Sequence, residues 1–408
     1  MAPSHWNNMR LVDFVTLHRG YELSEPKRNP GSVPVMGSFG VTGFHDTAIV
    51  KGPGVIVGRS GASFGQVKYC ASDFWPLNTA LYVMDFHGND EKFAYYFLTW
   101  MDFSAYNSGS AQPMLNRNYI HPIQITVPPI HEQRAIAHIL GSLDDKIELN
   151  RRMNATLEAM ARALFRSWFV DFDPVRAKAA GKQPDGMDTT TAALFPDSFE
   201  DSALGRVPKG WKVSTIGDEV RVVGGSTPST AEPAYWEDGT INWATPKDLS
   251  TLSSPVLLHT ERQITEAGLA KISSGLLPHG TVLLSSRAPI GYIALAEKPI
   301  AINQGFIAMV CDGSLPNLYV LYWTREHMEI IIGRANGTTF LEVSKANFRP
   351  IPMLVPSPKV LNAFMSIVEL LFQRLTVNLV ESAQLAVMRD SLLPKLLSGE
   401  IRPLKVME

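Results

Sequence analysis

The residues of this chain best suited to chemistry lie in a glycine-rich turn, residues 58–65, with the sequence Gly-Arg-Ser-Gly-Ala-Ser-Phe-Gly. Loops of this composition can cradle a phosphate group where they lead into the N-terminus of a helix. Here one strand-like run precedes the turn and another follows it, so no helix dipole would reach an anion. The turn is therefore only a weak match to a phosphate-binding loop.

Motifs of catalysis and cofactor binding are absent from the sequence. It contains no Gly-x-x-x-x-Gly-Lys-Ser/Thr loop and no strand followed by a glycine-rich turn suited to a nucleotide cofactor. It also lacks the Asn-Pro-Pro-aromatic and Asp-Pro-Pro-aromatic runs that hold an extruded base. Its 10 histidines are not spaced with acidic residues as in a zinc site, and no Ser-His-Asp trio recurs. We therefore expect a binding protein with no metal or cofactor of its own.

The composition is that of a globular protein with two or three domains: 408 residues, 45% hydrophobic, 19% charged, net charge -2. Basic and acidic residues also balance locally, with nine of each in residues 1–127 and thirteen of each in residues 206–355. The first residues lack the apolar core of a signal peptide, and no apolar run approaches the ~18 residues that span a bilayer, so a cytoplasmic location is expected. Cys70 and Cys311 are expected to be buried thiols.

The segment that contains the glycine-rich turn occurs twice in the chain, as an internal repeat. Gly20 and Gly225 lie 205 positions apart, from Gly54 onward the offset between the copies is 226, and from Pro122 onward it is 228. A period above 200 residues indicates two whole domains, because solenoid repeats are much shorter. Two copies of one unit predict a target with two parts.

Each copy divides into a β-rich part and a helical part. Short strands separated by glycine turns are expected in residues 1–128 and 206–356, each with one shorter helix, at 91–101 and 318–332.

Two long helices are expected at 129–172 and 357–402, the second followed by a tail to residue 408. Residues 173–205, rich in Pro, Gly, Ala and Thr, form a connector. The apolar residues of both helices are spaced alternately four and three apart, which is typical of a coiled coil. The expected fold class is α+β, with two β-rich domains separated by two long helices in an antiparallel coiled coil and a pseudo-twofold internal repeat.

Each helix has a polar residue at the same place in its apolar seam, Asn150 in the first and Asn378 in the second. Both lie near the midpoint of their helix, where an antiparallel pair brings equivalent residues together. We expect the two amides to approach one another and to set the register. The alternative is that both amides lie at the edge of the seam in water.

Several stretches of the chain resemble the specificity subunits of type I restriction-modification systems. The first helix carries three of them: Pro128-Pro-Ile-His-Glu-Gln-Arg-Ala-Ile-Ala, Leu143-Asp-Asp-Lys-Ile-Glu-Leu-Asn-Arg-Arg and Phe165-Arg-Ser-Trp-Phe-Val-Asp-Phe-Asp-Pro. Two more are Leu204-Gly-Arg-Val-Pro-Lys-Gly-Trp-Lys and Leu393-Pro-Lys-Leu-Leu-Ser-Gly-Glu-Ile-Arg. The second helix departs from the pattern, because residues 360–362 lack the Glu-Gln-Arg run.

The resemblance implies two target recognition domains, each reading one half of a split, asymmetric DNA sequence, held apart by the helix pair. It implies a non-catalytic subunit that binds two methyltransferase (M) subunits, which use S-adenosylmethionine to methylate adenine N6. Restriction (R) subunits that use ATP and Mg would join the complex. Two alternatives stay open: a structural scaffold whose β domains bind proteins, and a cryptic DNA methyltransferase.

Base recognition needs forked donors and amides on exposed loops. If the resemblance holds, the candidates in the first domain are Arg59, Ser60, Ser63, Gln112, Asn116, Arg117 and Asn118. Those in the second are Ser286, Arg287, Asn336, Thr338, Thr339 and Lys345, with Ser286 and Arg287 expected to correspond to Ser60 and Gly61. Lys51, Lys68 and Lys247 are expected to contact phosphates.

The start and end of the first helix hold two further groups of candidates. His131, Glu132 and Arg134 are either partner contacts or a solvated first turn. The aromatic residues Phe165, Trp168, Phe169 and Phe172 are expected to pack in a core, with a methyltransferase docking patch as the alternative.

Overall fold

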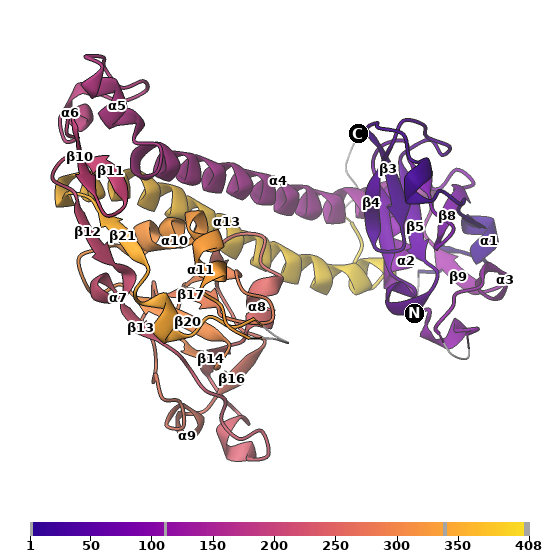
Figure 1. Cartoon of the computed structure of the whole chain (residues 1–408). Helices are drawn as coiled ribbons and strands as arrows, with labels where there is room; N and C mark the ends of the chain where they lie inside the picture. Colours follow the sequence, from indigo (N-terminus) through magenta and orange to yellow (C-terminus); the bar gives the residue numbers. More distant parts are fainter. Residues whose placement is uncertain (1–2, 110–111, 338–340, 404–408) are drawn as a thin grey trace. The chain divides into compact units, whose positions relative to one another are not determined.

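The structure is a computed structural model that describes residues 3–109, 112–337 and 341–403. The chain forms two compact units, Met1–Glu148 with Ser382–Glu408, and Leu149–Glu381. Each unit contains one β-rich domain and a part of both long helices (Figure 1). The α+β class expected from the sequence is confirmed.

A four-stranded antiparallel sheet forms the centre of the first β-rich domain. Its strand order is β2 (Thr16–Arg19), β8 (Ala80–Asp85), β5 (Gly54–Gly58) and β6 (Val67–Cys70). The other strands are β4 (Gly40–His45), β3 (Val33–Gly37) and β7 (Trp75–Pro76), which form a second sheet, and β1 (Asn7–Arg10) paired with β9 (Gln124–Val127). β5 is buried along its whole length, as the apolar run Val-Ile-Val requires.

Helix α2 (Glu91–Trp100) packs on this sheet and begins at an N-cap. The Asp90 carboxylate accepts a hydrogen bond from the main-chain N–H of Phe93 at 2.8 Å, which satisfies one free donor of the first turn. Phe93 and Phe97 lie against Phe14, with ring centroids 6.0 and 5.3 Å away. All three rings are buried, so they join the helix to the core of the domain.

The second β-rich domain repeats this plan with a larger sheet. Its strand order is β13 (Arg221–Val223), β20 (Phe306–Val310), β17 (Val282–Ser285), β18 (Ile293–Ala296) and β15 (Val256–Leu257). The smaller groups are β16 (Arg262–Ile264), β14 (Ile241–Ala244) and β19 (Ala301–Ile302), and the pair β12 (Lys212–Thr215) with β21 (Pro352–Val355).

The single helix expected at 318–332 is wrong. The structure has two helices there, α10 (Asn317–Glu326) and α11 (Met328–Gly333), which meet at His327. The backbone of His327 leaves the helical region, and its ring nitrogen Nδ1 donates to the carbonyl oxygen of Trp323 at 2.8 Å. The same carbonyl also accepts the main-chain N–H of His327 at 3.0 Å, so the helical hydrogen bonds of α10 continue to His327, and apolar periodicity alone does not reveal the break.

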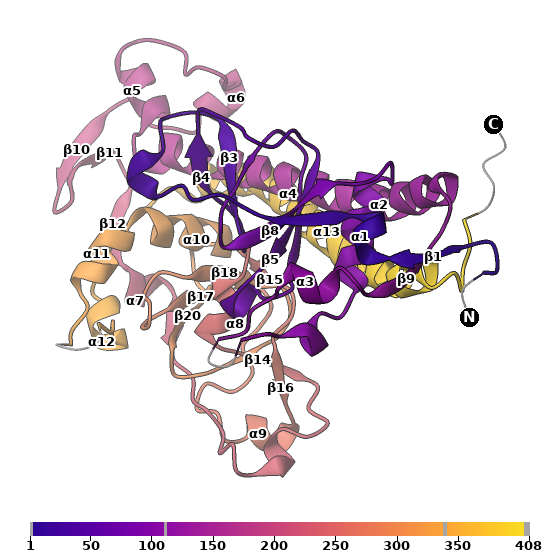
Figure 2. The ribbon, with the colours of Figure 1, turned by 90° about the vertical axis from the view of Figure 1, so that its right-hand side faces the viewer.

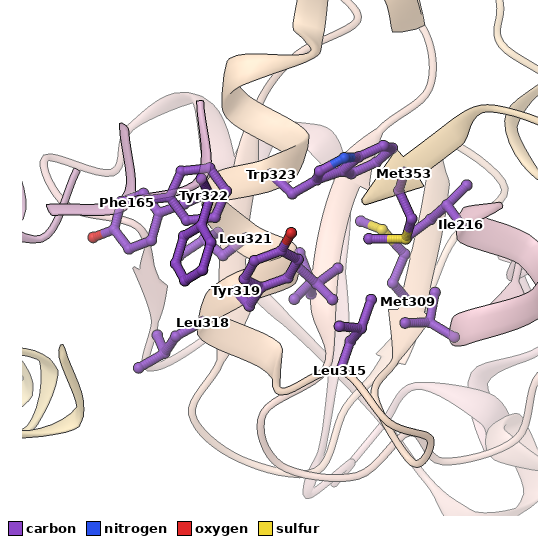
Figure 3. Close-up of a cluster of buried hydrophobic side chains, with 14 of the residues drawn as sticks. Phe165, Ile216, Met309, Leu315, Leu318, Tyr319, Leu321, Tyr322, Trp323 and Met353 are labelled. Carbon is purple, nitrogen blue, oxygen red and sulfur yellow. The ribbon is translucent and has the colours of Figure 1, made fainter. Parts of the chain in front are cut away.

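The core of the second unit gathers around α10. Tyr319, Tyr322 and Trp323 are almost fully buried, and Figure 3 shows them among side chains from the sheet and from α4. Phe165 of α4 lies 5.3 Å from the ring of Tyr319 and 5.9 Å from that of Tyr322.

The long helices are α4 (Ile130–Phe169) and α13 (Pro358–Leu397), each of 40 residues. Within the second unit they run antiparallel, because Phe165 packs on Phe364 at 6.0 Å whereas Asn154, earlier in α4, contacts the later residue Asn378. Figure 1 shows the parts of the two helices that belong to the second unit side by side. α13 is long and apolar enough, by length and composition, to cross a membrane, but Phe364, Val368 and Leu375 are buried in the protein core.

The connector contains two short helices and a hairpin. These are α5 (Asp173–Ala179), α6 (Thr189–Ala192) and the strands β10 (Phe199–Ser202) and β11 (Gly205–Pro208), which lie together in Figure 2. Phe195 places its ring edge-on to Trp168 with centroids 4.9 Å apart. The connector is therefore packed on the end of α4.

Candidate nucleic-acid interface

The glycine-rich turn of the first domain is held against a second loop that is distant in sequence. The main-chain N–H of Gly61 donates to the carbonyl of Pro113 at 3.0 Å, and that of Leu115 donates to the carbonyl of Arg59 at 2.7 Å. Ser60 and Met114 pair as an isolated β-bridge. Gly61 and Gly65 have φ of +68° and +73°, values that favour glycine. The backbone therefore brings two groups of candidates, from residues 59–63 and 112–118, to one place.

A cavity of about 240 Å³ opens between these two loops. Its floor is apolar, because Leu81 and Leu115 are 2% and 0% exposed. Three arginines and two asparagines line it: Arg19, Arg59, Arg117, Asn116 and Asn118. Arg19 was missed in the sequence, where it stands in a strand with no polar motif around it.

Two of these arginines converge on one main-chain oxygen. Arg59 Nη1 and Arg19 Nε donate to the carbonyl of Asn78 at 3.3 and 3.4 Å. Arg59 Nη2 also lies 3.8 Å from Met114 Sδ. Burial, followed by the nearby charge of Arg19, lowers the pKa of Arg59, as expected where two like charges share a partly desolvated site.

The other candidates of the first domain differ in how accessible they are. Ser63 is buried, and its hydroxyl donates to the carbonyl of Ser60 at 2.9 Å, so it stabilises the turn. Asn116 Oδ1 accepts from the N–H of Asn118 at 3.0 Å and caps α3 (Arg117–Ile120). Gln112 and Lys51 are exposed, whereas Ser60 and Lys68 are half-buried.

Strand pairing shows which positions of the two domains are equivalent. His18 pairs with Tyr82 and Val223 with Ala308, which agrees with offsets of 205 and 226. Ile56, however, also pairs with Tyr82, whereas Ala308 pairs with Leu283, an offset of 227.

The expected equivalence of Ser286 with Ser60 is therefore wrong by one residue. Ser286 corresponds to Arg59 and Arg287 to Ser60, and the bridge from Arg287 to Glu342 repeats the bridge from Ser60 to Met114. The two turns differ too much in sequence to show where the offset between the copies grows from 226 to 227. The sheet registers show it.

The candidates of the second domain are partly neutralised within it. Arg287 Nη1 lies 3.6 Å from a carboxylate oxygen of Glu342. Lys247 Nζ lies 2.7 Å from Glu261, the main cause of its raised pKa. Ser286 is buried, and Asn336 and Lys345 are exposed. Thr338 and Thr339 lie outside the described residues.

An additional cationic site that the sequence did not reveal lies on β16. The Arg262 guanidinium carbon stands 3.6 Å from the ring centroid of Trp236 and 5.5 Å from that of Trp243. The two indoles meet edge to face at 5.0 Å. Stacking on an aromatic face holds a guanidinium in place while its forked donors stay available.

The buried asparagines of the helix pair lie together in the second unit. Asn150 Nδ2 lies 3.4 Å from the carbonyl oxygen of Asn378 and 2.8 Å from a carboxylate oxygen of Glu381. Asn378 Nδ2 donates to Asn154 Oδ1 at 2.9 Å. All three asparagines are at most 1% exposed, so they lie inside the seam and not at its edge in water.

The candidate partner residues at the start of α4 are not alike. Glu132 is used inside the first unit, where it accepts hydrogen bonds from His5 at 2.6 Å and from the Trp6 indole at 3.1 Å. His131 is 71% exposed on its side chain, and Arg134 is exposed as well. The aromatic residues Phe165, Trp168 and Phe169 are buried in the core of the second unit, and Phe172 is half-buried.

Neither cysteine is in a disulfide, and the described residues contain no group of three His, Cys, Asp or Glu side chains that could hold a metal ion. Cys70 is buried as expected, whereas Cys311 is only half-buried, and burial raises the pKa of its thiol to about 12. The raised pKa makes the Cys311 thiol a poor nucleophile.

The chain matches known proteins along most of its length. Residues 3–159 and 208–373 match the model of the type I restriction modification DNA specificity domain. The specificity subunit of the type I restriction enzyme HindI from Haemophilus influenzae is 28% identical over 337 residues, 71% of each chain. The MjaIX specificity subunit from Methanocaldococcus jannaschii is 40% identical over 163 residues, 40% of this chain and 38% of that one.

A solved structure has the same fold. The type I restriction-modification S subunit from M. genitalium aligns with a TM-score of 0.62 at 18% identity, over 96% of each chain. This likeness shows the fold alone. The family model assigns the chain to a family, because it matches both halves of the repeat. The chain therefore belongs to the family of type I restriction-modification DNA specificity subunits.

Proposed function

We propose that this chain is the non-catalytic, DNA-reading subunit of a type I restriction-modification complex and that its two β-rich domains read different halves of a bipartite, asymmetric sequence. One observation carries this proposal. The two domains share strand registers, while the polar side chains at equivalent loop positions differ, as with Arg59 and Ser286 or Ser60 and Arg287. Equivalent scaffolds with different donors are what two different half-sites require.

The charge balance determines how such a domain would bind DNA. Basic and acidic residues are equal in number in each β-rich domain, so binding would not rely on a net positive charge of either domain. The affinity for DNA would come from a few placed donors and from the basic surfaces of partner subunits. Suitable donors are the stacked Arg262 of the second domain and Arg19, Arg59 and Arg117 of the first, which have no carboxylate partner among the described residues.

The proposed partners are two methyltransferase subunits, which would bind S-adenosylmethionine and methylate adenine N6, and restriction subunits that use ATP and Mg. A row of exposed apolar residues on α13 supports docking of another protein. Ile367, Leu370, Val377 and Val380 are 42%, 65%, 55% and 41% exposed. Their spacing of three and seven residues places them on one helix face, which a helix of the methyltransferase subunit would cover.

The proposal is tested by retention of duplex DNA on the purified complex of this chain with its methyltransferase subunits. Retention of one bipartite sequence over scrambled duplexes, lost at high salt, is expected. Retention that is independent of sequence would contradict the proposal and favour the protein-scaffold alternative. Labelled S-adenosylmethionine should bind the complex and not the chain alone. Binding to the chain alone would favour a cryptic methyltransferase.

A further inference from the structure

The arginine cavity of the first domain, lined by Arg19, Arg59 and Arg117, holds more positive charge than its surroundings neutralise. In the part of the chain that the structure describes, no carboxylate lies within 4.0 Å of these guanidinium groups. Arg19 and Arg59 are close enough to share the carbonyl of Asn78. Two positive charges that share one acceptor above an apolar floor repel one another, so the site favours a ligand with negative potential.

The guanidinium of Arg59 is prepositioned. Its Nη1 and Nη2 atoms each have a contact, with Asn78 and Met114, and its main-chain carbonyl is fixed by Leu115. A donor fork that is already ordered loses little freedom on binding. Phosphates are bound well by flexible cations, whereas reading a base edge requires a fork in a fixed place.

The second domain lacks this arrangement at every equivalent position. Arg19 is replaced by Gly224, Arg59 by the buried Ser286 and Arg117 by Lys345, at offsets of 205, 227 and 228. A Cβ placed on Gly224 would lie 3.4 Å from Lys345 Nζ, so the lysine occupies the space where the first domain has Arg19. Three forked cations in one domain thus correspond to one point charge in the other.

We propose that Arg19 and Arg59 together read one guanine in the half-site of the first domain, and that Arg19 is a specificity-determining residue in addition to the loop candidates. Guanine presents O6 and N7 as paired acceptors in the major groove, and the fork of Arg59 matches this pair. Arg19 would donate to the second lone pair of O6. The apolar floor of Leu81 and Leu115 strengthens both contacts by excluding water. This inference rests on the proposed function.

The experiment uses the complex with its methyltransferase subunits and compares wild type with Arg19→Lys and Arg59→Lys. Lysine keeps the charge and removes the fork. Each complex is bound to a panel of duplexes in which every base pair of the recognised sequence is replaced in turn. The matched control is Arg221→Lys, which makes the same change in β13, the strand equivalent to β2, where the arginine pairs with Asp312 at 3.1 Å.

We expect both variants to lose about 5- to 150-fold of their discrimination at one guanine of one half-site, with the other half-site read as in wild type. The control should discriminate like wild type. Unchanged discrimination at every position would overturn the inference. So would an equal loss on all duplexes, because a loss that does not depend on sequence indicates phosphate contacts. A wild-type complex without any sequence preference would instead contradict the proposed function itself.

Discussion

Asn378 of α13 donates its side-chain amide to Asn154 Oδ1 of α4 at 2.9 Å, buried in the seam between the two helices. Asn150 completes the group by its contact with the main-chain oxygen of Asn378. A buried amide that loses its partner is costly, so this group disfavours other registers of the two helices.

Replacement of Asn378 by alanine should destabilise the second unit. The buried Asn154 Oδ1 would lose its donor, at a cost on the order of 1–3 kcal/mol. Thermal unfolding of the purified complex measures this loss. Asn362→Ala changes an exposed asparagine of the same helix and should leave the unfolding temperature unchanged. Equal unfolding temperatures for both variants would show that the amide group does not stabilise the seam.

Two neighbouring aspartates of α4 should differ in their effect on the first unit. The Asp144 carboxylate accepts from the Tyr96 hydroxyl at 2.6 Å and from Arg389 Nη1 at 2.7 Å. Its replacement by alanine leaves the buried tyrosine hydroxyl without an acceptor and should cost about 1–3 kcal/mol. Asp145 is 74% exposed and pairs with Lys92 at 3.1 Å, so its replacement by alanine should lower the free energy of unfolding by less than about 1 kcal/mol. Chemical denaturation of both variants measures the difference, and the reverse order would refute this account of the contact.

His327 should make the second unit sensitive to acid. Burial lowers the pKa of its ring below the ordinary value of 6.5, so at mildly acidic pH the unfolded chain binds a proton that the folded chain does not. Its contribution to stability is therefore complete above about pH 6.5 and falls as the pH drops through the lower folded-state pKa. His327→Phe keeps a ring against Trp323 and should reduce the loss of unfolding temperature between pH 7.5 and about pH 5. His131→Phe, at an exposed position, should keep the wild-type profile, and identical profiles for all three proteins would exclude this role.

The exposed apolar row on α13 should be required for assembly. Leu370→Glu and Val377→Glu introduce charge into a surface that we propose a methyltransferase helix covers, and the desolvation of that charge opposes docking. Co-purification with the methyltransferase subunit should fall at least tenfold. Leu204→Glu makes the same change at another exposed leucine and should assemble normally. Normal assembly of all three variants would place the docking surface elsewhere.

The sequence predicted the features of this fold that repeat. Apolar spacing revealed the helix pair and its buried asparagines, because this spacing is a local pattern. Matching glycines revealed two domains, because their offsets stay nearly constant along the chain. The break at His327 remained hidden, since apolar spacing does not show where the backbone leaves the helical conformation.

The candidate site was less predictable, because charge neutralisation is a tertiary property. Arg287 and Lys247 looked like free cations in the sequence, yet each has a carboxylate partner in the fold, Glu342 and Glu261. Arg19 looked like an ordinary strand residue, yet it lies beside Arg59. One signal in the sequence could have indicated Arg19. Gly20 and Gly225 match between the two copies, whereas the residues before them, Arg19 and Gly224, differ.

The most direct test of the central claim is a map of N6-methyladenine in the DNA of cells that carry the wild-type gene, the Arg287→Ala variant or no gene. We predict that the wild type produces one motif with two different halves at a constant gap. The variant should relax one half only, and the motif should vanish without the gene. A motif that survives loss of the gene, or a folded Arg287→Ala protein that relaxes both halves equally, would contradict the assignment of one half-site to each domain.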